Sequence, residues 1–472
     1  MQNTISNTNL IIEKKTNFSI SIIVVLLISI YCLMNVNFWK AWKPDKGTPF
    51  VWDVKQYYAY LPATFIHHDL SFKFDNDFWL NETPTGHRIP MATYGMSLMY
   101  LPAFLVGYKI AINSKEKIDG YSDGFKDTLQ YGTIFYFTCA LLILRSLLLR
   151  YFKEITVSIG LLTLFFGTNL FYYVIDEGEM THSYLFFLFC SYLWLTVKWH
   201  ETPKIKFSIL LGLVLGLATL IRPTEASAGL IFVLYGIRNK SDFKTSFTFF
   251  KSHWIQLAII AFCFFLVLLP QMIYWKINAD SFWYNSYGNA SKFYFENPKF
   301  IKVLFGYRKG WLLYTPIMIF AIAGIFLSKK YIPKFNIPII IYFLINLYLI
   351  SSWWCWWFGG SFGMRALVQT YAFLVFFLCV FIEKIIDSNI YKPLLDNAVK
   401  LTTAAIFIFL INLNLIQAYQ AKKGILHYDA MTKKAYWTVF GKFELTGHET
   451  GQYWTSLKAP DYDGALKYGT EK

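Results

Sequence analysis

Charged residues are scarce in this 472-residue chain: Asp, Glu, Lys and Arg make up only 15% of it, and 56% is hydrophobic. So low a charge content excludes an ordinary water-soluble globule, because such proteins carry about 25% charged residues. Paired cysteines are missing too. The six cysteines are scattered through apolar segments without a CxxC pair, which excludes a disulfide framework and a cysteine-based zinc motif.

Internal repeats, low-complexity tracts and a signal-peptide cleavage site are also absent. The first apolar run follows Lys14 and Lys15, as a signal peptide would, but it ends without a small-x-small site. We therefore expect an uncleaved membrane anchor. The net charge of +15 does not indicate a nucleic-acid partner, because the Lys and Arg residues lie mainly in short loops between apolar runs. Cations in such loops mark the cytoplasmic face of a membrane protein.

Long apolar runs are what the sequence has in abundance, and about 20 residues of this kind cross a bilayer core as a helix. We predict an all-α polytopic membrane protein with about eleven transmembrane helices. The membrane domain covers 1–416 with a large first outer loop at about 40–126, and a polar tail, 417–472, lies on the outer side. The runs are 18–39, 127–149, 156–175, 182–199, 207–221, 226–237, 254–275, 311–328, 337–352, 366–383 and 399–416.

The distribution of cations sets the predicted orientation. Sixteen Lys and Arg residues lie in the loops on one side of the later runs, against eight on the other side. By the positive-inside rule the richer side is cytoplasmic. The stretch 94–112 must then lie along or dip into the outer leaflet rather than cross it. Segments 207–221 and 226–237 are expected to form a hairpin that turns at Arg222-Pro223, because proline disfavours helix at the preceding residue.

A single carboxylate, Asp53, stands at the start of an aromatic segment just beyond the first apolar run. Tyr57 follows four residues later, so the two side chains share a face if the segment is helical. An acid beside Trp and Tyr at the membrane interface indicates a site that works on something presented at the membrane surface. The alternative is an acidic turn with interfacial anchors. The segment reads Trp52-Asp53-Val54-Lys55-Gln56-Tyr57-Tyr58-Ala59-Tyr60-Leu61-Pro62.

A second acidic group precedes the run 182–199. Asp176, Glu177 and Glu179 lie within four residues and repel one another unless a cation, a metal or substrate hydroxyls are near. Glu179 and His182 are three residues apart, which would place a carboxylate and an imidazole on one helix face. Spacing this loose is weak evidence for a metal, so a divalent cation stays open and a solvated acidic loop is the alternative.

Several cations lie on the outer face, where the positive-inside rule does not ask for them: Arg222, Arg308 with Lys309, and Arg365. Charges at the ends of apolar helices are usually functional or paired. Local pairing of Arg222 with Glu225, and of Arg308 with lipid phosphate, is the alternative. Arg365 ends a loop whose glycines allow close backbone approach, and its guanidinium suits a phosphate. That loop reads Trp353-Trp354-Cys355-Trp356-Trp357-Phe358-Gly359-Gly360-Ser361-Phe362-Gly363-Met364-Arg365.

In the order and shared face of these motifs, the chain from about 18 to 385 resembles the GT-C glycosyltransferases, which use lipid-phosphate-linked sugars. It is most similar to bacterial members related to the protein mannosyltransferases and the aminoarabinose lipid A transferases. The resemblance implies that Asp53 is the catalytic carboxylate, that Glu177, the better match, or Glu179 is the second acid, and that 94–112 is a juxtamembrane helix. One departure is that Val54 follows Asp53 where many relatives carry a second acid. The matching segments also include Arg222-Pro223-Thr224-Glu225 and Arg308-Lys309-Gly310-Trp311 with Tyr314-Thr315-Pro316.

The expected activity is therefore transfer of a sugar from a polyprenyl phosphate to a lipid, glycan or protein acceptor, on the periplasmic face of a bacterial inner membrane. Asp53 would act as the base, and the second acid, Glu177 or Glu179, would assist it. Alternatives are a transporter or flippase of lipid-linked sugars, and a periplasmic glycan polymerase or ligase. The sequence shows neither the mid-membrane charges nor the repeat typical of transporters. The residues expected to bind substrate or phosphate are Tyr57, His182, Arg222, Arg308, Lys309 and Arg365.

Overall fold

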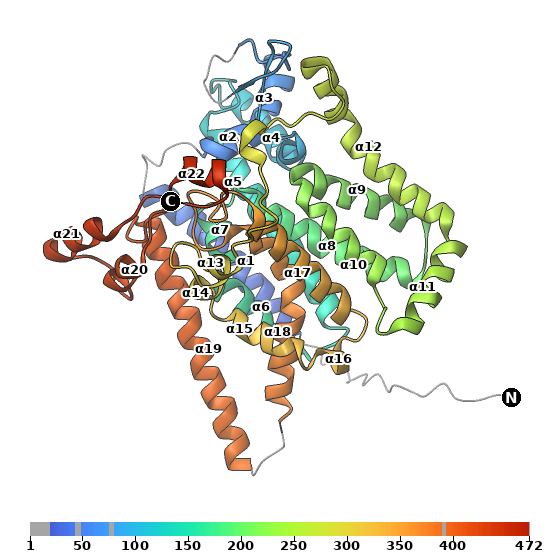
Figure 1. Cartoon of the computed structure of the whole chain (residues 1–472), viewed down its shortest axis with the longest axis vertical. Helices are drawn as coiled ribbons and strands as arrows, with labels where there is room; N and C mark the ends of the chain where they lie inside the picture. Colours follow the sequence, from blue (N-terminus) through green and yellow to red (C-terminus); the bar gives the residue numbers. More distant parts are fainter. Residues whose placement is uncertain (1–18, 43–48, 75–79, 389–392, 472) are drawn as a thin grey trace.

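The computed structural model describes residues 19–42, 49–74, 80–388 and 393–471, and helices make up most of them (Figure 1). Five segments of this described part are long and apolar enough to cross a membrane. The chain is thus an all-α membrane protein, as the sequence predicted. The five are α4 (Gly95–Asn113), α5 (Asp123–Leu148), α12 (Trp254–Ala279), η3 with α18 (Arg365–Ile386) and α19 (Pro393–Lys422).

The other elements include five shorter apolar stretches within α1, α6, α9, η1 with α10, and α17. Two short strands, β1 (Asn81–Glu82) and β2 (Arg88–Ile89), form an antiparallel hairpin. The remaining helices are α1 (Ile20–Trp42), α2 (Trp52–Tyr58), α3 (Tyr60–Phe65), α6 (Glu154–Phe166), α7 (Leu170–Ile175), α8 (Thr181–Glu201), α9 (Ile205–Ile221), η1 (Pro223–Ala228), α10 (Gly229–Leu234), α11 (Lys240–Ser252), η2 (Gly288–Ser291), α13 (Phe300–Phe305), α14 (Trp311–Tyr314), α15 (Met318–Ile325), α16 (Ser328–Tyr331), α17 (Asn336–Ser352), α20 (Lys433–Val439), α21 (Gly447–Ser456) and α22 (Tyr462–Tyr468).

Several apolar runs are not continuous helices. Helix α9 ends at Ile221, so the break expected before Pro223 is present. The run 311–328 is divided between α14 and α15, because Pro316 offers no backbone N–H and disfavours helix at Thr315. The run 156–175 is also divided, between α6, which ends at Phe166 before Gly167, and α7, although it contains no proline. Five segments long enough to span, α4 among them, and several broken ones leave both the figure of about eleven spans and the outer-leaflet position of 94–112 as predictions.

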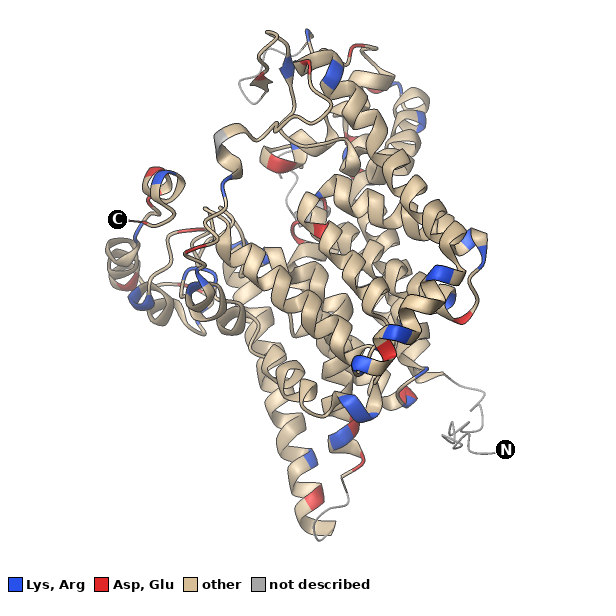
Figure 2. Ribbon diagram, turned by 45° about the vertical axis from the view of Figure 1, so that its right-hand side comes forward, with Lys and Arg blue, Asp and Glu red and all other residues tan. Residues whose placement is uncertain are grey.

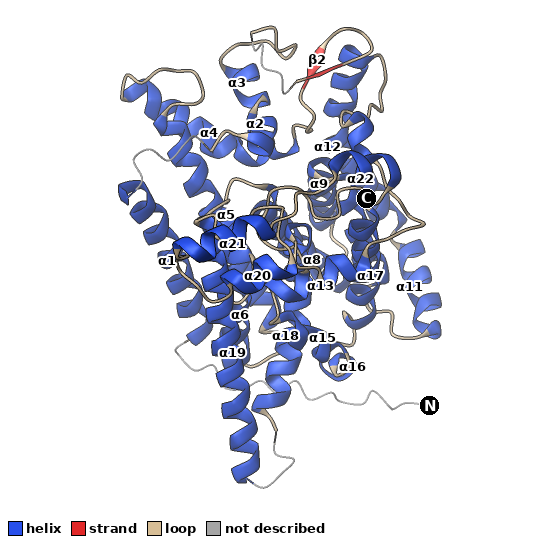
Figure 3. Cartoon of the chain, turned by 60° about the vertical axis from the view of Figure 1, so that its left-hand side comes forward, coloured by secondary structure: helices blue, strands red, loops and turns tan. Residues whose placement is uncertain are grey.

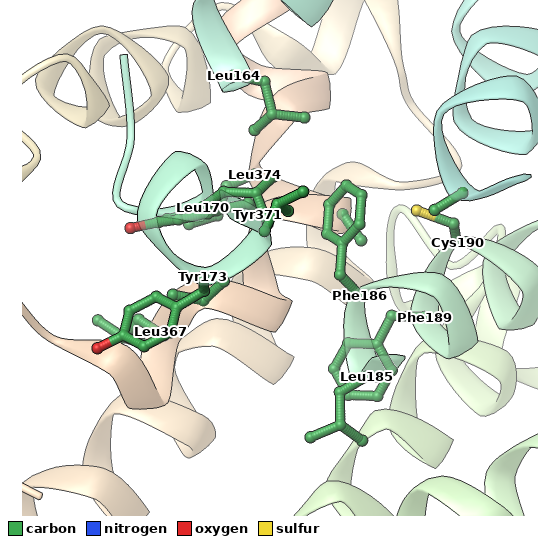
Figure 4. Close-up of a cluster of buried hydrophobic side chains, with 14 of the residues drawn as sticks. Leu164, Leu170, Tyr173, Leu185, Phe186, Phe189, Cys190, Leu367, Tyr371 and Leu374 are labelled. Atoms are coloured by element: carbon green, nitrogen blue, oxygen red, sulfur yellow. The ribbon is translucent and has the colours of Figure 1, made fainter. Parts of the chain in front are cut away.

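The core of the bundle lies where α6, α7, α8 and α18 meet. Figure 4 shows Leu164, Tyr173, Phe186 and Leu374 converging there from these four helices, and each is almost fully buried. Helices α15 and α18 approach so closely that a Cβ on Gly324 would overlap the backbone of α18. Close packing at such a crossing is typical of helices in membranes, where small residues let the backbones touch.

One end of the bundle, which we call the outer end, carries α2, α3 and α4 (Figures 1 and 3). The tail helices α20, α21 and α22 lie beside the bundle near this end. Helix α19 continues to Lys422, past the boundary expected at 416. Few charged residues lie along most of the bundle. The Lys and Arg (blue) and the Asp and Glu (red) gather at the opposite end of the bundle, in the outer loops and in the tail (Figure 2).

Candidate active site

An ion pair between Asp53 and Arg365 forms the centre of the candidate site at the outer end of the bundle. Arg365 Nη1 lies 3.2 Å from Asp53 Oδ2, although the residues are 312 positions apart. The Asp53 side chain is 46% exposed and that of Arg365 only 14%. The guanidinium Nε is buried and has no hydrogen-bond partner within the described part of the chain. The accessible Asp53 carboxylate therefore lies beside the Arg365 guanidinium, whose Nε–H makes no hydrogen bond to the described residues.

Helix α2 positions Asp53 at its first turn. Trp52, which precedes it, has a φ of 47° and is 85% exposed. A left-handed conformation at a bulky residue costs on the order of 1–3 kcal/mol, and such strain gathers at functional sites. The helix is held in place by hydrogen bonds from Ser97 Oγ to Tyr57 O at 2.5 Å and from Met91 N to Gln56 Oε1 at 2.7 Å.

Tyr57 is buried next to the ion pair, in agreement with the shared helix face expected from its spacing. Burial raises the pKa of its phenol, and the Asp53 carboxylate and Tyr287 raise it further, whereas Arg222 and Arg365 lower it. These five residues are therefore electrostatic neighbours. Sequence reasoning missed Tyr287, because nothing in its local pattern sets it apart from the chain's other 32 tyrosines.

The three carboxylates of the acidic loop after α7 lie in three different environments. Asp176 forms a buried ion pair with Lys422 at the end of α19. Glu177 accepts a 3.2 Å hydrogen bond from the Tyr172 hydroxyl. Burial raises the pKa of Glu177, while Arg365 and, more weakly, Lys309 lower it. Glu177 is thus the acid of this loop that interacts with the cations of the site.

Glu179 is buried next to two tyrosines. Its backbone carbonyl accepts a hydrogen bond from Tyr100, and its carboxylate is an electrostatic neighbour of Tyr100 and Tyr184. His182 is completely buried, with its ring 4.5 Å from that of Tyr173. His182 is also an electrostatic neighbour of Arg222 and Arg365. The choice between Glu177 and Glu179 as the second acid stays a prediction.

A buried hydrogen bond that the sequence did not predict ties η1 to η3. Gln369 Nε2 donates to Glu225 Oε1 at 2.8 Å, and both side chains are 1% exposed. Glu225 ends the segment that Arg222 begins, and Gln369 lies one turn after Arg365. This bond therefore links the two segments that carry the arginines beside Asp53.

Arg308 and Lys309 form a separate group that the tail covers. Arg308 pairs with Glu471 and lies 5.2 Å from the Trp357 ring. Lys309 is 1% exposed, and its ammonium donates to the backbone carbonyls of Ser361 and Tyr428. Burial, followed by the nearby Arg365, lowers the pKa of Lys309 to about 7. A cavity of only about 10 Å³, room for one water, remains beside these two cations.

The glycine-rich loop before Arg365 has a fixed shape. Gly363 has a φ of 58°, and a Cβ there would lie 3.1 Å from that of Tyr314. The Tyr173 hydroxyl accepts a hydrogen bond from Phe362 N at 3.0 Å and donates to Phe362 O at 3.1 Å. Ser361 N donates to the tail carbonyl of Tyr428 at 3.2 Å. The loop thus presents Arg365 from a rigid support.

A protein-bound divalent metal finds little support in the donor set. Among the described residues, no three His, Cys, Asp or Glu side chains gather in a group that would hold an ion. Mg²⁺ and Ca²⁺ need several oxygen ligands, whereas the carboxylates of Asp53 and Asp176 are paired with cations of the chain.

In comparisons with known proteins, no family model and no curated protein matches this chain. Its function is accordingly argued from the site.

Proposed function

We propose that the protein is a membrane glycosyltransferase that moves a sugar from a polyprenyl phosphate to an acceptor hydroxyl. The observation that carries the proposal is the accessible Asp53 carboxylate 3.2 Å from Arg365, at the end of an all-α membrane bundle. A base and a phosphate-binding cation are the two groups that this reaction requires next to each other.

The chemistry follows from these positions. Asp53 would take the proton of the acceptor hydroxyl as its oxygen forms a bond to the anomeric carbon. The bond from that carbon to the phosphate oxygen breaks on the opposite side, and the configuration inverts. The departing polyprenyl phosphate carries the negative charge, which Arg365 would neutralise through its Nη and its unused Nε. Glu177, an electrostatic neighbour of the same arginine, would help to orient the acceptor.

The proposed setting is the periplasmic face of a bacterial inner membrane, with about eleven spans of a GT-C-like bundle around the site. The lysine and arginine distribution in the loops supports this orientation. The donor would arrive through the lipid, and membrane lipids would surround the bundle. The acceptor would be a lipid, a glycan or a protein.

The test is transfer of radiolabelled sugar from polyprenyl phosphate donors into membranes that contain the wild type or the Asp53→Asn variant. We expect the variant to lose about 10²- to 10⁴-fold in rate, the usual contribution of a general base, with unchanged folding. Asp123→Asn is the matched control, because that side chain is 85% exposed at the start of α5. Equal transfer by the wild type and Asp53→Asn would contradict the proposal and favour transport or an acceptor-specific ligase.

A further inference from the structure

The outer loop between α12 and α13, residues 281–299, is hydrogen-bonded to two other outer segments, at Ser286 and at 290–294; we call it the strap. Its first anchor is on the first outer loop. Ser286 Oγ donates to Met91 O at 2.6 Å, and Asn81 Nδ2 donates to Ser286 O at 2.6 Å. Met91 in turn is bonded through its N–H to Gln56 of α2. This end of the strap is therefore tied to the segment that carries Asp53.

The second anchor is on the glycine-rich loop. Trp354 Nε1 donates to Ala290 O at 2.8 Å, and Trp354 N donates to Lys292 O at 3.2 Å. Tyr294 N donates to Ser352 O at 2.6 Å. This end is tied to the segment that leads to Arg365. The strap thus joins the two segments whose side chains form the central ion pair.

Tyr287 lies between the two anchors, one residue after Ser286. Its electrostatic neighbours are Asp53, Arg222 and Arg365, which come from α2, the α9–η1 junction and η3. The residue keeps 40% of its surface exposed, so a substrate can reach it. Its hydroxyl stays protonated at neutral pH, because an ordinary tyrosine has a pKa of about 10, and partial burial and then Asp53 raise the pKa of Tyr287 further.

We propose that Tyr287 is a substrate-contacting residue that donates its hydroxyl hydrogen to the phosphate of the lipid-linked donor, between Arg222 and Arg365. The inference rests on the proposed function and adds to it the place of the phosphate. Two guanidinium groups and one neutral O–H donor fit a phosphate diester anion. Arg308 and Lys309 fit it less well, because Glu471 already neutralises Arg308, and Lys309 is only 1% exposed and donates to two backbone carbonyls.

Binding of farnesyl phosphate to the purified full chain in detergent tests the contact directly, with farnesol as the probe without phosphate. We expect Tyr287→Phe to weaken farnesyl phosphate binding about tenfold, the usual worth of a hydrogen bond to a charged group, and to leave farnesol binding unchanged. Tyr284→Phe, three residues earlier on the strap, is the matched control and should keep wild-type affinity for both probes.

Other results would overturn the proposal. Wild-type binding by Tyr287→Phe combined with weak binding by Tyr287→Ala would show that only the ring matters. Equal weakening for farnesol would place Tyr287 against the lipid tail. In the transfer assay, a wild type that moves sugar and a Tyr287→Phe variant with unchanged donor KM would defeat this inference alone. A wild type that transfers nothing would defeat the proposed function, and farnesyl phosphate binding would then decide the role of Tyr287.

Discussion

Lys309 should make the stability of the protein rise with pH. Folding lowers its pKa from 10.5 to about 7, chiefly by burial, whereas the unfolded chain keeps the ordinary value. Between these two values the unfolded state binds the extra proton, so the free energy of unfolding increases with pH. Below pH 7 both states are protonated, and the penalty of the buried charge is present in full. One pKa unit is worth about 1.36 kcal/mol, which predicts a gain of about 3 kcal/mol between pH 7 and pH 9.5.

The perturbation that isolates this effect is Lys309→Met, which keeps a long apolar side chain and removes the titrating group. Equilibrium unfolding in mixed micelles, by titration with SDS at pH 7 and pH 9.5, gives the free energy for each protein. The difference between the wild type and the variant should change by about 3 kcal/mol between the two pH values. Lys434→Met, an exposed lysine of α20, serves as the control and should show no such change.

A Lys309→Met variant that gains stability with pH as steeply as the wild type would refute the reasoning. Lys309 would then be charged at neutral pH in the folded protein, stabilised by the carbonyls of Ser361 and Tyr428.

Three further predictions concern the site and the orientation of the chain. Arg365→Lys should lower single-turnover transfer by about 10²-fold, the usual effect of losing one preorganised donor, without loss of folded protein, because an ammonium does not reproduce the guanidinium that faces Asp53. Gly363→Ala should destabilise the protein by more than the about 1–2 kcal/mol that a left-handed conformation costs, because the new Cβ would also crowd Tyr314; SDS unfolding measures the loss. Gly359→Ala is the control, since Gly359 has a φ of 65° with open space around it and should show the conformational cost alone. Equal effects of the two substitutions would contradict the packing argument. A cysteine at exposed Lys467 in the tail should react with a membrane-impermeant maleimide in intact cells, and one at exposed Lys329 in α16 should react only after permeabilisation; the reverse pattern would invert the proposed topology.

The sequence was informative where chemistry depends on a short local pattern. Apolar runs predicted an all-α membrane protein, and Pro223 predicted the end of α9. The positive-inside count put Asp53 and Arg365 on one face, and the structure joins them in an ion pair. The breaks inside 156–175 and 311–328 were missed, because composition alone does not show that Thr315-Pro316 interrupts a run that is apolar throughout.

Long-range contacts explain what the sequence did not predict. The sequence did not predict that Arg308 pairs with Glu471, 163 residues later. Lys309 donates to two backbone carbonyls. Every residue type has a backbone carbonyl, so no sequence motif predicts these two hydrogen bonds. Tyr287 gains its neighbours only because the strap is fastened at Ser286 and at 290–294. Each of these contacts depends on how distant segments pack, and a single sequence carries no record of that.

Helix α12 couples the thickness of the bilayer to the position of the strap. Only 17% of its most apolar window is buried, and it packs mainly on α9, so lipid chains contact most of its length. The strap begins where this helix ends. A bilayer thinner than the hydrophobic length of an exposed helix makes that helix tilt, and a tilted α12 would displace the strap relative to Asp53. The acyl-chain length of the surrounding lipids would thereby set the distance between the strap and the Asp53–Arg365 ion pair.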